Sequence, residues 1–159
     1  MKKLLIVSLS VTMLFLLKAN FSNAQGLMPV TEYFNTNSPG RHYYATNTSV
    51  TNQAPTGSGW VTDGVIGYLS DWTALQPTYF IYEFYKSGTN SYYYTNDINR
   101  HPVGYVNTAI IGAWIANGFN SAPVYEYYND GDYYYSTSPT TPTGYVYDGI
   151  AFYVYTNQH

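Results

Sequence analysis

Side chains that could do catalytic chemistry are sparse in this 159-residue chain. It has no cysteine, no Gly-x-Ser-x-Gly motif and three histidines, so nucleophilic catalysis has little support. Nine carboxylates are present, and a glycosidase needs two beside the scissile bond. However, Glu32, Glu83 and Glu126 occupy equivalent places in a repeated pattern, which an asymmetric catalytic site should break. We therefore expect no enzyme activity, and glutamates that face solvent or bond to neighbouring tyrosine hydroxyls.

Metal binding has one weak candidate, the segment Asn129-Asp130-Gly131-Asp132. Its carboxylates are spaced like the start of a calcium loop, but the downstream glutamate of such a loop is missing. A hairpin turn explains the segment better. His42 and His101 lie far apart without the spacing of metal ligands. We expect no metal and no cofactor.

The elements that must position these residues come from an internal repeat. Four landmarks occur three times in the same order. They are an aromatic strand with a central glutamate (31–34, 82–85, 125–128), a tyrosine run (42–45, 92–95, 133–136), a glycine–aromatic–valine step (59–61, 104–106, 144–146) and an apolar strand (65–69, 110–114, 150–154). The repeat units cover about 30–70, 79–116 and 123–155.

Each unit predicts about four short strands, twelve in all. In the third unit Asp130-Gly131 supplies the positive φ values of a two-residue hairpin turn. Asp63-Gly64 and Asp148-Gly149 predict a second tight turn or a bulge, whereas the second unit has Thr108-Ala109 there and must differ in backbone or be strained. We expect an all-β domain with pseudo-threefold symmetry. A β-trefoil is favoured over a small three-bladed propeller or a prism-like barrel.

The first 24 residues predict a signal peptide of bacterial type. Lys2 and Lys3 precede an apolar run over 4–17, and Ser22-Asn23-Ala24 offers a small-x-small cleavage site. The single mature domain would then cover 25–159. The apolar run is shorter than the roughly 20 residues of a membrane-spanning helix, so we expect no span in the mature chain. We expect export through the Sec pathway to the extracellular space, with the periplasm or the cell surface as alternatives.

The charge balance excludes some partners. Removal of the signal leaves Arg41, Lys86 and Arg100 against nine carboxylates, a net charge of −6. Three basic residues cannot follow a phosphate backbone, so we expect no nucleic acid partner. The same deficit argues against docking on anionic lipid. An exported chain of this length can bury enough surface to fold without disulfides.

The repeat unit resembles an uncharacterised repeat family of secreted bacterial and fungal proteins, a domain of unknown function, here in three copies. The family pattern runs Tyr-Arg-Phe-Tyr-Asn, Gly-Asp-His-Phe-Tyr-Thr and Gly-Trp-x-Tyr-Glu-Gly-Val-Ala-Phe-Tyr. The third unit is closest to it, over 125–129, 131–136 and 144–153, while His42 and Gly59-Trp60 keep the family's histidine and Gly-Trp pair in the first. Glutamate replaces the arginine in all units, and tyrosine replaces the histidine in two. By analogy, the resemblance implies an accessory binding role.

The 21 tyrosines, all beyond the predicted cleavage site, suit sugar binding, because a sugar ring offers an apolar C–H face and a rim of hydroxyls. In the tyrosine runs, alternation places Tyr43, Tyr93 and Tyr134 on one face beside small residues, which we take as the interior. The opposite face should be partly exposed. The predicted ligand-binding residues are His42, Tyr44, Asp71, Trp72, Tyr92, Tyr94, Tyr133 and Tyr135.

The favoured function is a secreted, non-catalytic, lectin-like module whose partner is a glycan or a cell-surface component. The first alternative is a surface or matrix domain that binds proteins through an exposed aromatic patch. A small secreted hydrolase or hydrolase inhibitor ranks third. The sequence leaves the ligand and the oligomeric state unspecified.

Overall fold

The computed structural model describes residues 26–38, 41–46, 55, 57, 59–71, 78–115 and 120–157. These residues form nine antiparallel strands and no helix, so the all-β prediction is confirmed. The strands are β1 (Leu27–Asn35), β2 (His42–Ala45), β3 (Trp60–Ser70), β4 (Thr78–Lys86), β5 (Ser91–Thr95), β6 (Val106–Ile115), β7 (Ser121–Asn129), β8 (Asp132–Ser136) and β9 (Val146–Tyr155). The predicted signal peptide lies outside the described residues, within which no helix could cross a membrane.

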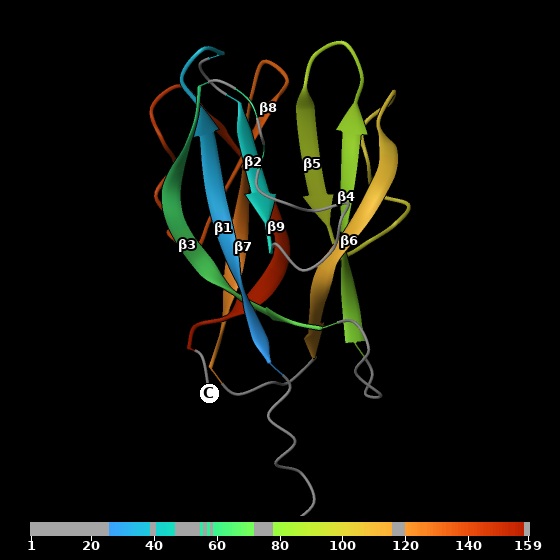
Figure 1. Cartoon of the computed structure of the whole chain (residues 1–159), viewed down its shortest axis with the longest axis vertical. Coiled ribbons are helices and arrows are strands. Elements are labelled where there is room, and N and C mark those ends of the chain that lie inside the picture. The colour runs from blue at the N-terminus through green and yellow to red at the C-terminus, as the bar shows by residue number, and fades with distance from the viewer. Residues whose placement is uncertain are drawn as a thin grey trace, which may run out of the picture.

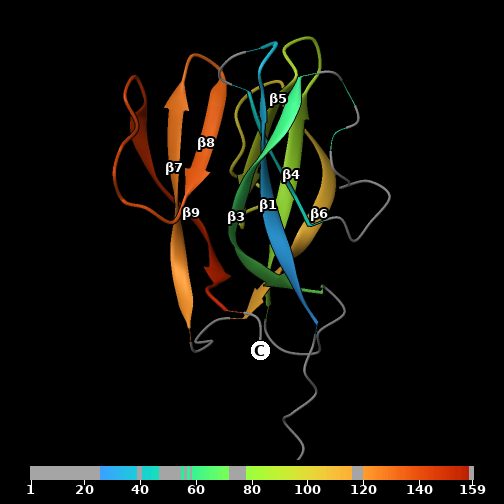
Figure 2. The ribbon, with the colours of Figure 1, turned by 60° about the vertical axis from the view of Figure 1, so that its left-hand side comes forward.

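The strands form three groups with the same internal pairing. We name β1–β3 the first group, β4–β6 the second and β7–β9 the third. In each group the first strand lies in the middle and pairs antiparallel with the other two. The three hairpin turns lie at one end of the molecule, and the long strands converge at the other (Figures 1 and 2). Asp130 and Gly131 have φ values of 42° and 83°, which confirms the predicted hairpin turn between β7 and β8.

The three groups join at the convergent end into one sheet. Ser70 of β3 pairs with Ala113 of β6, and Tyr68 of β3 pairs with Tyr155 of β9. The strand order is β5-β4-β6-β3-β9-β7-β8, with β1 and β2 attached beside β3. Over the described residues this sheet stays open and contains nine strands, so neither the predicted twelve strands nor the predicted trefoil is confirmed.

The strand count falls short because the chain forms a bulge before each apolar strand, which is one of the two forms predicted for Asp63-Gly64 and Asp148-Gly149. The register shifts by one residue at equivalent places in β3, β6 and β9, so each of them continues as one long strand. Gly64 and Gly149, which follow the bulges of β3 and β9, have φ values of 135° and 129°. Ala109 at the equivalent place in β6 has no positive φ, which confirms that the backbone of the second unit differs there.

Two glycines allow the long strands to approach closely. A Cβ atom on Gly67 would lie 2.4 Å from Val154 Cγ2, and one on Gly112 would lie 2.7 Å from Leu69 Cβ. Phe152 holds the equivalent position in the third group and is 1% exposed. The core is therefore asymmetric at the convergent end, because the third group has the Phe152 ring at the position where the other two groups have a glycine.

Candidate functional site

His42 and Asp132 connect the first strand group to the third. The Nδ1 atom of His42 lies 3.0 Å from Oδ2 of Asp132, and the backbone N–H of His42 donates to Oδ1 at 3.2 Å. The Tyr145 hydroxyl donates to the same Oδ2 at 2.5 Å. Since a carboxylate can only accept, this arrangement places the imidazole proton on Nδ1. Asp132 of β8 is thus bound to His42 of β2 by two hydrogen bonds, and the third bond, from Tyr145, stays within the third strand group.

The other ring nitrogen of His42 faces a second carboxylate. Its Nε2 atom lies 3.8 Å from Oε1 of Glu32. Burial raises the pKa of Glu32 to about 7, while the nearby His42 acts in the opposite direction. The His42 side chain is only 10% exposed and contacts the rings of Phe34 and Tyr134. A Ser–His–Asp mechanism needs an imidazole within reach of a nucleophile and a substrate, and this enclosed ring does not offer that geometry.

Chemical modification can test whether His42 is enclosed. We expect diethyl pyrocarbonate to modify His42 much more slowly than His101, which is exposed and stacked on Phe84 at 4.6 Å. Mass spectrometry of peptides after limited modification measures both rates in one sample, so His101 serves as the internal control. Equal rates at the two histidines would show that His42 is open to solvent.

The three equivalent glutamates are buried, with exposed fractions of 5% for Glu32, 3% for Glu83 and 0% for Glu126. The prediction that they bond to tyrosine hydroxyls is confirmed for two of them: Tyr44 donates to Glu32 at 3.2 Å, and Tyr94 donates to Glu83 at 3.3 Å. Neither carboxylate oxygen of Glu126 has a hydrogen-bond partner among the described residues.

The nearest opposite charge to Glu126 is on Arg100. The Nη2 atom of Arg100 lies 3.7 Å from Oε2 of Glu126. Burial, reinforced by the neighbouring Asp148, raises the pKa of Glu126 to about 8 against the opposing effect of Arg100. Glu126 is therefore largely protonated at neutral pH, which lowers the cost of burying its carboxyl group in the core.

Tyr44, Tyr94 and Tyr135 form a closed ring of hydrogen bonds. The N–H of Tyr44 donates to the hydroxyl of Tyr94 at 3.1 Å, that of Tyr94 to Tyr135 at 2.9 Å, and that of Tyr135 to Tyr44 at 2.9 Å. Their exposed fractions are 0%, 1% and 0%, so the prediction that they are exposed is wrong. Tyr43 and Tyr93 on the opposite side are buried as well. The alternation rule failed because β2 and β5 are covered on both faces.

The remaining predicted binding residues do not form one site. Tyr133 is buried, and its ring lies 4.9 Å from that of Tyr93. Tyr92 is partly buried and lies 4.6 Å from the ring of Tyr43. Asp71 is exposed beyond the end of β3, and Trp72 lies outside the described residues.

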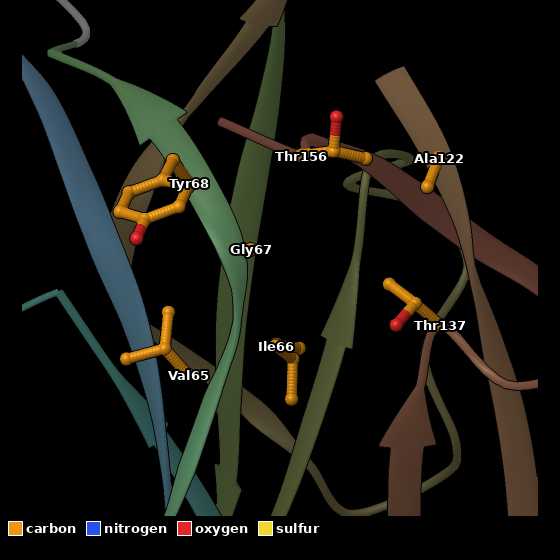
Figure 3. A pocket seen from close by; sticks show the side chains of 7 residues that line it. All are labelled: Val65, Ile66, Gly67, Tyr68, Ala122, Thr137 and Thr156. Atoms are coloured by element: carbon orange, nitrogen blue, oxygen red, sulfur yellow. The ribbon is translucent and has the colours of Figure 1, made fainter. Parts of the chain in front are cut away.

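A pocket that the sequence analysis missed lies between the first and third strand groups (Figure 3). Its volume is about 290 Å³. The strand β3 provides one wall, and the third group provides the other with Ala122, Thr137 and Thr156 (Figure 3). The residues from β3 are Val65, Ile66, Gly67 and Tyr68. Only a comparison of the three units at each junction could have indicated this site.

The pocket lining is uncharged and contains hydroxyl groups that are available to a ligand. The hydroxyls of Tyr68 and Thr137 have no hydrogen-bond partner among the described residues. The Thr156 hydroxyl donates to the carbonyl of Asn120 at 3.0 Å, and its oxygen can still accept. The pocket therefore offers donors and acceptors but no ionic group. The ring of Tyr68 lies on the β1 side of β3, whereas Ile66 lies on the side of the third strand group (Figure 3). Across the described residues, no cluster of three or more His, Asp or Glu could hold a metal ion.

The fold and these sites define an all-β module with enclosed ionisable groups and one described pocket of neutral lining. The chain belongs to the family described as Domain of unknown function (DUF5648), whose model matches residues 17–103. This result agrees with the resemblance to an uncharacterised family. The match spans the first strand group and the whole β4–β5 hairpin and ends before β6. Comparisons with curated proteins and with solved structures gave no match.

Proposed function

We propose that this protein is a secreted, non-catalytic module that binds neutral carbohydrate, with its three strand groups arranged about a pseudo-threefold axis. The observation that carries the proposal is the pocket lined by Ile66, Thr137 and Thr156. Its volume of about 290 Å³ lies just below the range for sites of drug-sized ligands, roughly 300–1,000 Å³, and so suits a small ligand.

The chemistry of the lining favours a sugar over other small ligands. A sugar ring presents hydroxyls that donate and accept, together with C–H groups that pack on aromatic and aliphatic side chains. Thr137 supplies a free hydroxyl, Thr156 supplies an acceptor, and Ile66 supplies an apolar contact from the side of β3 that faces them (Figure 3). Because the lining carries no charge, a charged ligand would lose its hydration without gaining an ionic partner.

The non-catalytic part of the proposal follows from the carboxylates. Glu32 and Asp132 both flank His42, but their side chains are each 6% exposed. A paired-carboxylate hydrolase needs both groups at the scissile bond of a bound substrate. The pocket lining contains no carboxylate that could take either role.

Ile66→Ala tests the pocket directly. We expect this variant to lose glycan binding by about tenfold, because it removes the aliphatic side chain that β3 presents on the side of Thr137 and Thr156 (Figure 3). The matched control is Ile98→Ala, since Ile98 is 49% exposed and does not line the pocket. A glycan array with neutral plant and bacterial wall polysaccharides identifies ligands for the purified protein, and titration calorimetry compares the variants. A blank array from folded protein would refute the proposal.

A second candidate function is binding of a protein partner. The valine that ends the glycine–aromatic–valine step is exposed in every strand group: Val61 is 48% exposed, Val106 is 61% exposed and Val146 is 68% exposed. Exposed apolar positions that recur in this way suit a protein interface. Chemical cross-linking of the protein on intact cells separates this candidate from glycan binding, because a protein receptor gives a discrete adduct that glycosidase treatment leaves in place.

A further inference from the structure

The three junctions between strand groups are built from equivalent residue pairs at the convergent end. Each pair joins a residue near the start of the middle strand to one in the long outer strand of the same group. The pairs are Met28–Leu69, Tyr79–Trp114 and Ala122–Val154. The first member is therefore large in two groups and a methyl group in the third.

The junction between the second and third groups is filled by aromatic rings. Trp114 stacks on Tyr79 at 5.5 Å with an interplanar angle of 29°. It stacks on Tyr153 of β9 at 4.8 Å with an angle of 21°. Tyr153 is the equivalent of the pocket residue Tyr68, by its position in the register of the long strand. A sugar at this junction would have to displace a packed ring.

The junction between the first and second groups is closed in a different way. The Thr46 hydroxyl donates to the carbonyl of Ile111 at 2.7 Å, and Thr46 itself is buried. The methyl group of Met28 lies within 3.3 Å of the place where a Cβ atom on Gly112 would stand. Thr46 and Met28, which hold the places of Thr137 and Ala122, are therefore already packed or bonded within the protein.

The junction between the third and first groups lacks both closures. Ala122 stands where Tyr79 and Met28 stand in the other groups. Thr137 follows β8 as Thr46 follows β2, but its hydroxyl has no partner among the described residues. The pocket therefore results from the small side chain at position 122 and the unengaged hydroxyl at position 137.

Building on the proposed function, we infer that this pocket is a single sugar site per chain, that it takes one ring of a neutral sugar, and that Ala122 determines its size. Threefold repetition alone would predict three equivalent sites that gain by multivalency. The aromatic stack and the Thr46 contact close the two equivalent places. The site therefore exists only at the junction where Ala122 replaces a large side chain and the Thr137 hydroxyl is unbonded.

The test combines stoichiometry with a variant that fills the pocket. Glucose, galactose, mannose, N-acetylglucosamine and their linear trimers are titrated into the ¹⁵N-labelled full chain and followed by NMR and calorimetry. We expect one site per chain, with shifts at Tyr68, Ala122 and Thr137. Ala122→Tyr should weaken binding about tenfold or more, which is one decade in Kd. Since Tyr79 occupies the equivalent place in β4, this variant should fold, as the melting temperature will show.

Two further variants keep the result interpretable. Thr143→Tyr adds the same side chain at an exposed loop position and should leave binding unchanged. Thr137→Val removes only the hydroxyl and should weaken binding even if Ala122→Tyr does not fold. Three sites per chain, or full affinity in both pocket variants, would overturn this inference and leave carbohydrate binding intact. Absence of binding to every sugar and trimer would overturn the inference together with the proposed function.

Discussion

Raising the pH from about 4.5 to about 8 should lower the free energy of unfolding by several kcal/mol, because two buried glutamates must ionise in the folded protein. Burial raises the pKa of Glu32 from 4.5 to about 7 and that of Glu126 from 4.5 to about 8. A carboxyl group whose pKa is higher in the folded state binds its proton more tightly there. Its contribution is complete below the unfolded pKa and is lost as the pH rises through the folded pKa.

The size of the effect follows from these pKa differences. Each pH unit between the unfolded and folded pKa corresponds to about 1.4 kcal/mol for one group. Glu126 should contribute the larger share, since its pKa is raised further and Arg100 lies 3.7 Å away rather than in hydrogen-bond contact. Ionisation of Glu32 lowers the free energy of unfolding by less, because the Tyr44 hydroxyl and His42 stabilise the charged form of Glu32.

Glu126→Gln isolates the contribution of Glu126 to the pH dependence of stability. The variant has nearly the same shape as the protonated glutamate and cannot ionise, so we expect a higher melting temperature at pH 8 and a flatter dependence on pH. The control is Asp97→Asn, which removes an exposed carboxylate while keeping an acceptor for the N–H of Asn99. Urea unfolding from pH 4.5 to 8.5 measures both. If the free energy of unfolding falls with pH as steeply in Glu126→Gln as in the parent, Glu126 is ionised in the core without cost.

Local sequence signals predicted the local structure of this fold well. Asp130-Gly131 forms the expected hairpin turn, and the Asp-Gly steps in β3 and β9 form bulges, one of the two forms expected there. A glutamate placed among tyrosines indicated a hydroxyl partner, which holds for Glu32 and Glu83. These features depend on neighbours in the same strand or hairpin, so a single unit contains the information.

Features that depend on how the groups pack were not accessible in this way. Tyr44 follows the alternation of an exposed position, yet it is fully buried because β5 and β8 cover it from the other groups. The pocket depends on Ala122 and Ile66, which are far apart in sequence and line one cavity only because β9 pairs with β3. The alternation of side chains along one strand predicts exposure only if one face of that strand meets solvent. The strands β2 and β5 are covered on both faces, so alternation gave the wrong result there.

Tyr44→Phe should destabilise the protein although it removes a single oxygen atom. That hydroxyl accepts the N–H of Tyr135 at 2.9 Å and lies 3.0 Å from the Tyr135 carbonyl and 3.2 Å from Glu32. Phenylalanine leaves a buried amide without an acceptor, which costs ~1–3 kcal/mol for the amide alone. The matched control is Tyr147→Phe, because Tyr147 is half exposed and its change should stay within about 0.5 kcal/mol.

The double variant Tyr44→Phe/Tyr94→Phe tests whether the ring acts as one unit. Each hydroxyl accepts from the backbone of another ring member, so the first loss loosens the geometry on which the second bond depends. We expect the two changes together to cost less than the sum of the single changes, by about 0.5 kcal/mol or more in urea unfolding. Strict additivity would mean that the three bonds are independent. Neutral single variants would mean that the burial of the rings, rather than their hydroxyls, holds the three groups together.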